Sequence, residues 1–426
     1  MVCPSTLFLV TNSYPLGTGE DFIENEIGDL AERFGRVVVV AVQTRPGDVI
    51  TRPVAGNVEV IRAGGPRPAG RAALLAAARG LAHLPRGSWN RDTLRDPRRL
   101  GLEAMFEEHA RDTEADLLAQ LPALGLRPGS HAVVYSYWFL DTARVAMLLA
   151  ADLRARGVVV DRLVSRAHGY DLYPERAPYG HLPQRERLVA AFDAVCPVSE
   201  QGTRTLRSGW PGYAGKIGTH HLGTADPGVT ADCSREPFHI VSCAYLVPVK
   251  RMTRMPGVLA ELRGRGVDAR WTHLGGGPQT EAVREAAASA GVRDAVELRG
   301  DVPHEQILQI ERGLRPSCLI NLSASEGLPV SMMEATSLGI PIIGTDVGGV
   351  SEIVTDSVNG HLVPADFTDG QAADALQRLA ELPDSEYTAQ CTAARRTWER
   401  DFDQAVVYPR FCVETLGAPA DTDSVS

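Results

Sequence analysis

Lysine is nearly absent from this sequence. Only Lys216 and Lys250 are lysines among the 43 basic residues, and the rest are arginines. A position that needs only positive charge is filled by arginine in such a sequence, so each lysine is a candidate for a specific role. The 53 acidic residues give a formal net charge of −10 at pH 7, which disfavours general binding to nucleic acid.

Long apolar runs and paired cysteines are also missing. The run at 6–10 is too short for the apolar part of a secretory leader, and no segment reaches the roughly 20 apolar residues that span a bilayer. The seven cysteines include no CxxC pair, so neither a disulfide framework nor a zinc ribbon is indicated. We expect a cytoplasmic protein that needs no metal and no bound cofactor.

Strand and helix patterns alternate along the chain. The length of 426 residues allows two or three domains, and short β-rich runs between helical periods are typical of parallel α/β layers. The expected strands form two series, 6–11, 37–42, 132–135, 162–165 and 194–198, then 238–243, 270–274, 296–299, 318–322 and 340–344. The Gly- and Pro-rich stretch 223–237 between the two series is the expected linker.

The predicted fold class is therefore α/β, with two doubly wound, Rossmann-like domains. We place the first domain at 1–228 and the second at 236–400. The string Asp401-Phe-Asp-Gln404 has the form of a capping box and predicts a last helix at 401–418. The small polar tail 419–426 is expected to fray.

The segment 323–335, SASEGLPVSMMEA, carries the most chemical information. A strand is expected to end near Leu322, and Pro329 suits the first position of a helix. The free N–H groups and the dipole of that helix attract anions such as a diphosphate. Glu326 and Glu334 can each accept paired hydrogen bonds from vicinal hydroxyls. A capped surface helix with two solvated glutamates fits the same spacing.

Other candidate residues follow expected strands at the carboxyl edge of each sheet, where open α/β sheets bind ligands. Lys250 and Arg251 follow the first strand of the second series, and the retained lysine favours a functional role over a solvated loop. Gly17 and Gly19 follow the first strand of the chain, without the third glycine of a dinucleotide fingerprint. His168 and Asp171 follow the strand at 162–165, where a structural histidine is an equally good interpretation.

Together these motifs resemble the retaining glycosyltransferases of the GT-B fold, a family that includes bacterial exopolysaccharide, lipopolysaccharide and natural-product transferases. The resemblance extends from residue 6 to about residue 416. Glu326 and Glu334 match the E-x7-E motif, and Gly348-Gly349 matches the loop that follows it. The turn 275–278 resembles the turn after the second strand, and the strings YSYW at 135–138 and SRAHGYD at 165–171 look like acceptor-side motifs.

The resemblance implies two domains facing a cleft, with the last helix crossing back to the first domain. It implies transfer of a sugar, with retention, from a nucleoside diphosphate sugar to a saccharide, lipid-linked or secondary-metabolite acceptor. Glu326 would hold the sugar hydroxyls, Glu334 the ribose and Lys250 the diphosphate, with His168 at the reaction centre. The wider expected set is Arg251, Gly276, Val302, Gly327, Leu328, Pro329 and Val330 on the donor side, and Gly17, Gly19, Tyr137, Trp138 and Asp171 on the acceptor side.

One position departs from the family pattern. Tyr245 stands where the family usually has an arginine, five residues before the diphosphate lysine. Either Arg251 supplies the second cation, or diphosphate binding is weaker than usual. Two alternatives remain open: a nucleotide-sugar 2-epimerase with the same architecture, and a non-catalytic protein that binds nucleotide or saccharide.

The segment 62–99 has the opposite charge from the rest of the chain, with nine arginines against two acids. Leu74, Ala78 and Leu81 share one helical face, which we expect to point inward. The segment could contact an anionic surface peripherally at the inner face of the membrane, or it could be a solvated insertion that packs on the first domain.

Overall fold

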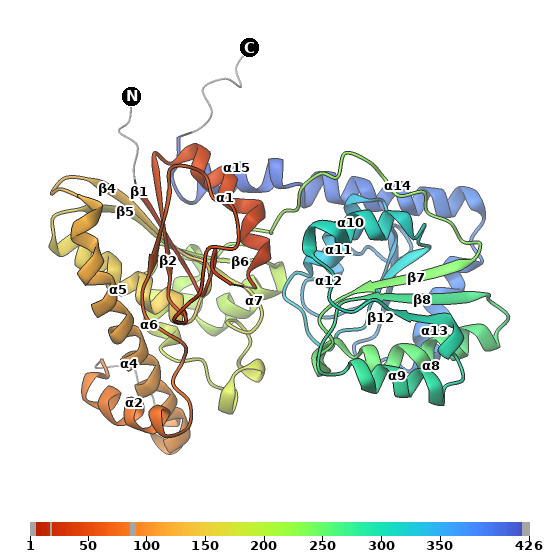
Figure 1. Ribbon diagram of the computed structural model, residues 1–426, viewed down its shortest axis with the longest axis horizontal. Helices are drawn as coiled ribbons and strands as arrows, with labels where there is room; N and C mark the ends of the chain where they lie inside the picture. Colours follow the sequence, from red (N-terminus) through yellow and green to blue (C-terminus); the bar gives the residue numbers. More distant parts are fainter. Residues whose placement is uncertain (1–5, 18, 86–90, 420–426) are drawn as a thin grey trace, which may run out of the picture. The chain divides into compact units, whose positions relative to one another are not determined.

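A computed structural model of the chain describes residues 6–17, 19–85 and 91–419 (Figure 1). The chain divides into two compact units, one formed by the residues up to His220 and from Tyr408 onward, the other by His221–Val407. The unit boundary thus falls earlier in the chain than the linker expected from the sequence. Each unit contains a six-stranded parallel sheet with helices on both faces (Figure 1).

The sheet of the first unit has the strand order β3-β2-β1-β4-β5-β6. Its strands are β1 (Thr6–Thr11), β2 (Arg36–Ala41), β3 (Val58–Arg62), β4 (His131–Ser136), β5 (Val159–Ala167) and β6 (Ala194–Pro197). Its α-helices are α1 (Glu24–Arg33), α2 (Gly70–His83), α3 (Arg91–Arg95), α4 (Pro97–Gln120), α5 (Asp141–Ala155), α6 (Arg185–Ala191) and α7 (Glu200–Gly209). This is the dinucleotide-fold order, in which the strand order reverses between the parallel strands β1 and β4.

The central strands are apolar because helices cover both of their faces. Along β1, Phe8 and Val10 belong to one buried cluster, whereas Leu7 and Leu9 belong to another on the opposite face. A strand buried on both sides reads in the sequence as an uninterrupted apolar run, which is why β1 and β2 were predicted within one residue of their observed bounds.

The second unit repeats this order as β12-β11-β10-β7-β8-β9. Its strands are β7 (Phe238–Cys243), β8 (Ala269–Leu274), β9 (Val296–Leu298), β10 (Cys318–Asn321), β11 (Ile342–Thr345) and β12 (Gly360–Val363). Its α-helices are α8 (Met255–Gly264), α9 (Thr280–Ser289), α10 (His304–Gly313), α11 (Val330–Ser337), α12 (Val350–Ile353), α13 (Asp369–Ala380) and α14 (Asp384–Asp401). The fold class predicted from the sequence is confirmed.

The last helix, α15 (Gln404–Glu414), carries the chain back into the first unit. Phe411 and Cys412 are fully buried there, in the cluster that contains Leu7 and Leu9. The expected capping box at Asp401 is wrong in detail: α14 continues through Asp401, and Asp403 Oδ1 accepts the Ala405 N–H at 2.9 Å instead. The expected tail lies outside the described residues, except for residue 419.

Two edge strands, β3 and β12, were absent from the sequence-based expectation. β3 contains only two fully buried positions, Val58 and Ile61, and β12 begins at Gly360 and holds only four residues, so neither has a long apolar run. Edge strands bury less surface and leave a weaker pattern. Within the described residues no helix is both long and apolar enough to cross a bilayer.

Helix α2 packs on α4 with a face opposite to the predicted one. Gly80 and Ala76 are buried, and a Cβ at Gly80 would lie 1.9 Å from the Ala104 carbonyl oxygen. Leu74 is 72% exposed and Leu81 47% exposed. The expectation that the leucines point inward is therefore wrong, because two helix backbones this close together admit only small residues.

Candidate functional site

The predicted donor-side residues gather where the strand order of the second sheet reverses. Lys250 follows β7 and Glu326 follows β10, its neighbour in the sheet. Crevices beyond the carboxyl ends of such strands are the ligand sites of open α/β sheets. Lys250 Nζ lies 2.7 Å from Glu326 Oε1, so the fold joins two residues that are 76 positions apart.

Glu326 is held as a carboxylate in a nearly buried position. Asn321, the last residue of β10, donates from Nδ2 to Glu326 Oε1 at 3.1 Å. Burial raises the pKa of Glu326, but the Lys250 ammonium and the hydrogen bonds of Ser323 and Asn321 outweigh it and leave the pKa below its ordinary value. The carboxylate therefore stays ionised near pH 7 and can accept hydroxyl hydrogen bonds.

A glycine turn fixes the backbone beside Glu326. Gly349 donates its N–H to the Gly327 carbonyl at 2.7 Å. Gly348 has φ +58°, and a Cβ there would lie 2.0 Å from the Glu326 carbonyl oxygen. Only glycine meets both conditions, so the Gly348-Gly349 pair of the sequence has a local structural reason.

The start of α11 offers free main-chain donors next to this turn. Pro329 is the N-cap of the helix, one position earlier than predicted, and its carbonyl accepts from Met332 and Met333. Val330 and Ser331 therefore hold the first two helical N–H groups, which have no partner within the helix itself. Leu328 is almost buried beside them. Such a helix start offers main-chain donors to an anion, and the diphosphate site expected here stays a prediction.

Arg251, predicted to be a diphosphate cation, contacts the backbone of its own unit. Its guanidinium donates at 2.7 Å to each of three backbone carbonyls, those of Leu322, Ser323 and Ala365, and its carbon lies 4.9 Å from the centre of the Phe367 ring. Arg251 positions the loop that carries Glu326 because its planar fork can bond several carbonyls at once. Its role as the second diphosphate cation stays a prediction. Tyr245, which stands where the family usually has an arginine, is 60% exposed.

Glu334, expected to bind ribose, already has a side-chain partner. His304 Nε2, at the start of α10, lies 2.6 Å from Glu334 Oε1. Two turns of α10 further along, Glu311 is fully buried, and among the described residues neither of its carboxyl oxygens has a hydrogen-bond partner. Burial and the neighbouring Glu334 raise the pKa of Glu311 well above its ordinary value.

The remaining donor-side residues lie on the loops after β8 and β9. Gly276 donates its N–H to Asp301 Oδ1 at 3.0 Å, and a Cβ at Gly276 would lie 2.6 Å from that oxygen. Val302 follows Asp301 and is half-buried. The Gly276–Asp301 contact holds these two loops together. The Leu246 N–H donates to the Gly276 carbonyl at 2.7 Å and so joins them to the loop that carries Lys250.

In the first unit, Glu20 organises the loop after β1. Its carboxylate accepts the N–H groups of Asn12, Ser13 and Tyr14 at 2.6–3.0 Å, and it accepts Trp138 Nε1 at 2.6 Å. The predicted acceptor residue Trp138, which follows β4, is therefore fixed by a residue that follows β1. Gly17 and Gly19 flank the undescribed residue 18, with φ +64° and +95°, and they shape this loop.

His168 lies inside a stack of aromatic rings. Its ring centre is 4.4 Å from that of Trp138 and 5.2 Å from that of Tyr137. Its Nε2 donates to the Tyr137 carbonyl at 3.0 Å, and burial and Arg166 lower the pKa of His168 to about 3. The imidazole is thus neutral at pH 7 with its lone pair on Nδ1, which suits a hydrogen-bond acceptor and makes it a poor proton carrier.

The prediction that Asp171 faces the acceptor cleft is wrong. Asp171 is fully buried, and its two oxygens accept the N–H groups of His168 and Phe139, both at 2.7 Å. A carboxylate can satisfy two main-chain donors at once and so tie together the ends of β4 and β5. Asp171 therefore positions His168.

Sequence reasoning missed three residues whose side chains position predicted site residues: Glu20, Asn321 and His304. Asn321 left a usable signal, because it is a polar residue that ends an apolar strand. Glu20 and His304 left none, since their partners, Trp138 and Glu334, are distant in the sequence. Within the described ranges no three His, Cys, Asp or Glu side chains gather as metal ligands would.

Comparison with known proteins shows what the second unit is similar to. The profile described as Glycosyl transferases group 1 matches residues 234–398, nearly the whole second unit. The second unit of this chain is therefore similar to the group 1 glycosyltransferases. The putative colanic acid biosynthesis glycosyltransferase WcaL of Escherichia coli (strain K12) is 28% identical to this chain over 277 residues. That match covers 62% of this chain and 66% of WcaL, slightly less than two thirds of the relative.

Solved structures share the fold of this glycosyltransferase over nearly its full length. Sucrose-phosphate synthase from Thermosynechococcus elongatus has a TM-score of 0.69 at 16% identity and covers 96% of this chain and 97% of its own. Anabaena HepE, solved in complex with UDP and glucose, has a TM-score of 0.64 at 14% identity and covers 98% of this chain and 100% of its own. The GT-B fold expected from the sequence is confirmed.

Proposed function

We propose that this glycosyltransferase moves a hexosyl group, with retention of configuration, from a nucleoside diphosphate sugar to a saccharide, lipid-linked or secondary-metabolite acceptor. The second unit binds the donor and the first unit binds the acceptor. The observation that supports this most is the Lys250–Glu326 ion pair beside the free N–H groups of α11, because it offers a cation, anion-binding amides and a hydroxyl acceptor together.

In this reaction, the departing diphosphate gains charge as the glycosidic bond breaks. Lys250 and the Val330 and Ser331 amides stabilise that charge from fixed positions, which is the largest single contribution in many enzymes. Glu326 accepts hydrogen bonds from sugar hydroxyls, and Glu334 accepts them from the ribose. His304 holds Glu334 in place. Among the described residues we assign no carboxylate as a covalent nucleophile, so we propose attack from the face that the diphosphate leaves.

Thermal unfolding with UDP, GDP, ADP and dTDP tests the donor side. A ligand that binds only the folded state stabilises it by about 2.7 kcal/mol at 100 times its Kd. We expect one nucleotide to raise the unfolding temperature of the wild-type protein, and a Glu334→Ala variant to require a higher concentration of it. No shift with any of the four contradicts a nucleoside diphosphate donor. UDP is the first choice because HepE was solved with it.

An acceptor panel separates transferase from epimerase. Nucleotide release that depends on an added acceptor supports transfer. Release without any acceptor, together with an altered sugar, supports the 2-epimerase alternative. The anomeric configuration of the product, read by NMR, tests retention.

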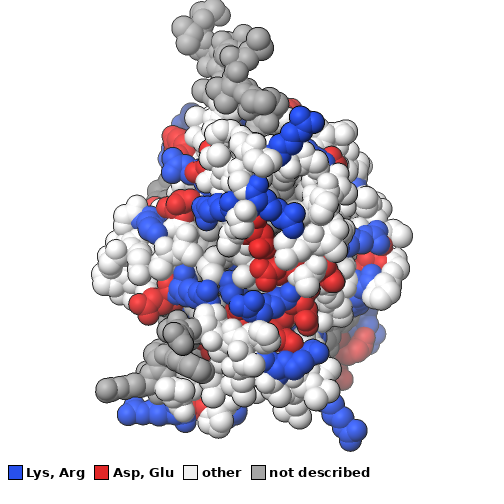
Figure 2. Space-filling view, turned by 90° about the vertical axis from the view of Figure 1, so that its left-hand side faces the viewer, with Lys and Arg blue, Asp and Glu red and all other residues white. Residues whose placement is uncertain are grey.

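We also propose that α2 makes a peripheral contact with an anionic membrane, at the cytoplasmic face of the inner membrane. Leu74, Leu75 and Leu81 of α2 are 72%, 67% and 47% exposed. Basic residues accompany them, but several are paired within the unit: Arg79 with Glu108 and Arg98 with Asp96. Figure 2 accordingly shows Lys and Arg interspersed with Asp and Glu on this side of the first unit. The exposed leucines therefore support a membrane contact more strongly than the net charge does.

Sedimentation with liposomes tests this contact. We expect the wild-type protein to bind anionic vesicles at low salt and a Leu74→Ser/Leu75→Ser variant to lose most of that binding. Val358→Ser, which removes a 51% exposed side chain from the second unit, is the matched control. Equal binding by the double variant and the control contradicts a membrane role for α2.

A further inference from the structure

Three half-buried polar side chains form a hydrogen-bonded row at the carboxyl edge of the first sheet. Gln43 follows β2, Asn12 follows β1 and Tyr170 follows β5. Gln43 Nε2 donates to Asn12 Oδ1 at 3.0 Å, and Asn12 Nδ2 donates to the Tyr170 hydroxyl oxygen at 3.1 Å. The reaction as proposed uses none of these three residues, which we call the polar row. Because open α/β sheets bind ligands at this edge, the polar row is a candidate binding surface.

Aromatic contacts join the polar row to His168. The centre of the Tyr170 ring lies 4.8 Å from that of Trp138, and the centre of the Trp138 ring lies 4.4 Å from that of His168. The half-buried Phe22 also contacts this group, with its ring centre 5.9 Å from that of His168. The partly exposed rings of Tyr170 and Phe22 therefore belong to the same aromatic cluster as the imidazole.

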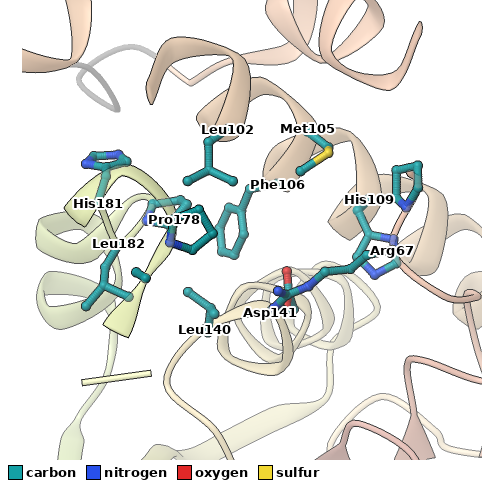
Figure 3. Close-up of a pocket in the computed structure, with 13 residues that line it drawn as sticks. Arg67, Leu102, Met105, Phe106, His109, Leu140, Asp141, Pro178, His181 and Leu182 are labelled. Atoms are coloured by element: carbon teal, nitrogen blue, oxygen red, sulfur yellow. Dashed lines mark hydrogen bonds and ion pairs between the residues drawn. The ribbon is translucent and has the colours of Figure 1, made fainter. Parts of the chain in front are cut away.

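Three charged side chains act electrostatically on the Tyr170 hydroxyl, and all three are already paired. The carboxyl oxygens of Asp171 accept two main-chain N–H groups, and those of Glu20 accept three. Arg67 forms an ion pair with Asp141, as Figure 3 shows. A phosphate or carboxylate bound beside Tyr170 would therefore find no unpaired cation among these groups. An uncharged ligand, in contrast, can bond to the amides and the phenol of the polar row.

The polar row can both donate and accept hydrogen bonds. The Tyr170 oxygen accepts from Asn12, which leaves the hydroxyl proton to donate to a further group. Burial raises the pKa of Tyr170 above its ordinary value, which itself lies above neutral pH, so the phenol keeps this proton. The Gln43 side chain adds an amide oxygen as an acceptor. A sugar hydroxyl also donates and accepts, so it matches this combination.

We propose that the polar row and the Phe22 ring bind an uncharged sugar ring of the acceptor. The C–H face of a sugar packs on an aromatic ring, and its hydroxyls bond to amide and phenol groups. The inference rests on the proposed function, because it takes the first unit to be the acceptor side. It narrows the acceptor from any saccharide, lipid or metabolite to a molecule that presents an uncharged sugar ring, and it assigns Gln43, Asn12 and Tyr170 to the recognition of that ring.

Saturation-transfer NMR of the full chain with methyl glucoside, methyl galactoside and methyl mannoside tests the proposal. Each titration includes whichever of UDP, GDP, ADP and dTDP raises the unfolding temperature. Monodeoxy analogues of the tightest hexoside then show which hydroxyls are bound. We expect loss of one hydroxyl to weaken binding about tenfold, which corresponds to one hydrogen bond between uncharged groups. The methyl hexuronide that matches the tightest hexoside should bind more weakly than the hexoside, because it is charged.

The variant Tyr170→Phe removes only the hydroxyl of the polar row. We expect this variant to bind the tightest hexoside and one of its monodeoxy analogues equally, although the wild-type protein distinguishes them about tenfold. Tyr179→Phe, which removes the same group from a 52% exposed side chain of the first unit, is the matched control and should keep the wild-type preference. A general disturbance of the fold would weaken all these ligands alike and leave the preference unchanged.

Four results would overturn the proposal. They are equal hydroxyl preferences in Tyr170→Phe and Tyr179→Phe, tighter binding of the hexuronide than of the hexoside, a preference for phenol over every methyl hexoside, and no hexoside binding by a wild-type protein that nucleotide stabilises. The last of these leaves the donor side of the proposed function intact. In contrast, the absence of a shift in unfolding temperature with all four nucleotides contradicts the proposed function itself.

Discussion

The substitution Gly348→Ala should impair the donor side, because the single Cβ atom that it adds has no room beside Glu326. The positive φ of +58° costs a non-glycine residue about 1–2 kcal/mol. The new Cβ would lie 2.0 Å from the Glu326 carbonyl oxygen, whereas ordinary contact begins at 3.4 Å, so the two loops must separate by about 1.4 Å. Glu326 moves with its carbonyl, and the 2.7 Å contact of its carboxylate with Lys250 is lost.

Gly291→Ala is the matched control, because Gly291 has φ +70° and no atom within 4 Å of the position of a Cβ. Backbone strain should lower the free energy of unfolding of both variants. Overpacking should lower that of Gly348→Ala by about 1–3 kcal/mol more. For a unit of roughly this size each kcal/mol lowers the unfolding temperature by about 2–4 °C.

The assay combines thermal unfolding with sugar transfer. A misplacement of about 1 Å at a reacting group costs roughly 100-fold in rate. We therefore expect transfer by Gly348→Ala to fall about 100-fold and transfer by Gly291→Ala to stay within twofold of the wild type. Equal unfolding temperatures and equal transfer rates for the two variants would refute the role assigned to the close approach of Gly348 to Glu326.

Three further predictions concern single side chains. Glu326→Gln should retain nucleotide affinity and lose transfer, because an amide cannot match a carboxylate as hydroxyl acceptor; turnover near the wild-type rate would contradict the assignment. Lys250→Ala should cost about 2–4 kcal/mol of transition-state stabilisation in kcat/KM, and full activity in Lys250→Arg would show that the retained lysine is chance. His168 binds a proton in the unfolded chain below pH 6.5 and in the folded chain only near pH 3, so acidification destabilises the first unit. Between pH 7 and pH 5, His168→Gln should lose roughly 2 kcal/mol less stability than the wild type; equal losses would contradict the low pKa.

The loops of the candidate site were predictable only in part. The positions of Lys250, Glu326 and Gly348 at strand ends follow from apolar runs and turn residues, which are local signals. The hydrogen-bond partners of those residues cannot be predicted from local signals. Arg251 looked like a second cation next to Lys250, yet the fold turns its guanidinium toward three backbone carbonyls. Asp171 looked like a cleft residue, yet it accepts two buried N–H groups.

The sequence by itself determined the two series of strands, their parallel α/β class and the places where the chain turns. These features depend on residues that are neighbours in the sequence, because a strand buried on both faces is an apolar run and a tight turn needs glycine. Tertiary structure decided which polar groups meet: Lys250 with Glu326, His304 with Glu334, and Trp138 with Glu20. It also decided that Gly80 of α2 faces α4 while Leu74 faces outward. Hydrogen bonds and close packing join residues through space, and no local pattern specifies a partner that lies 30 to 118 residues away in the sequence.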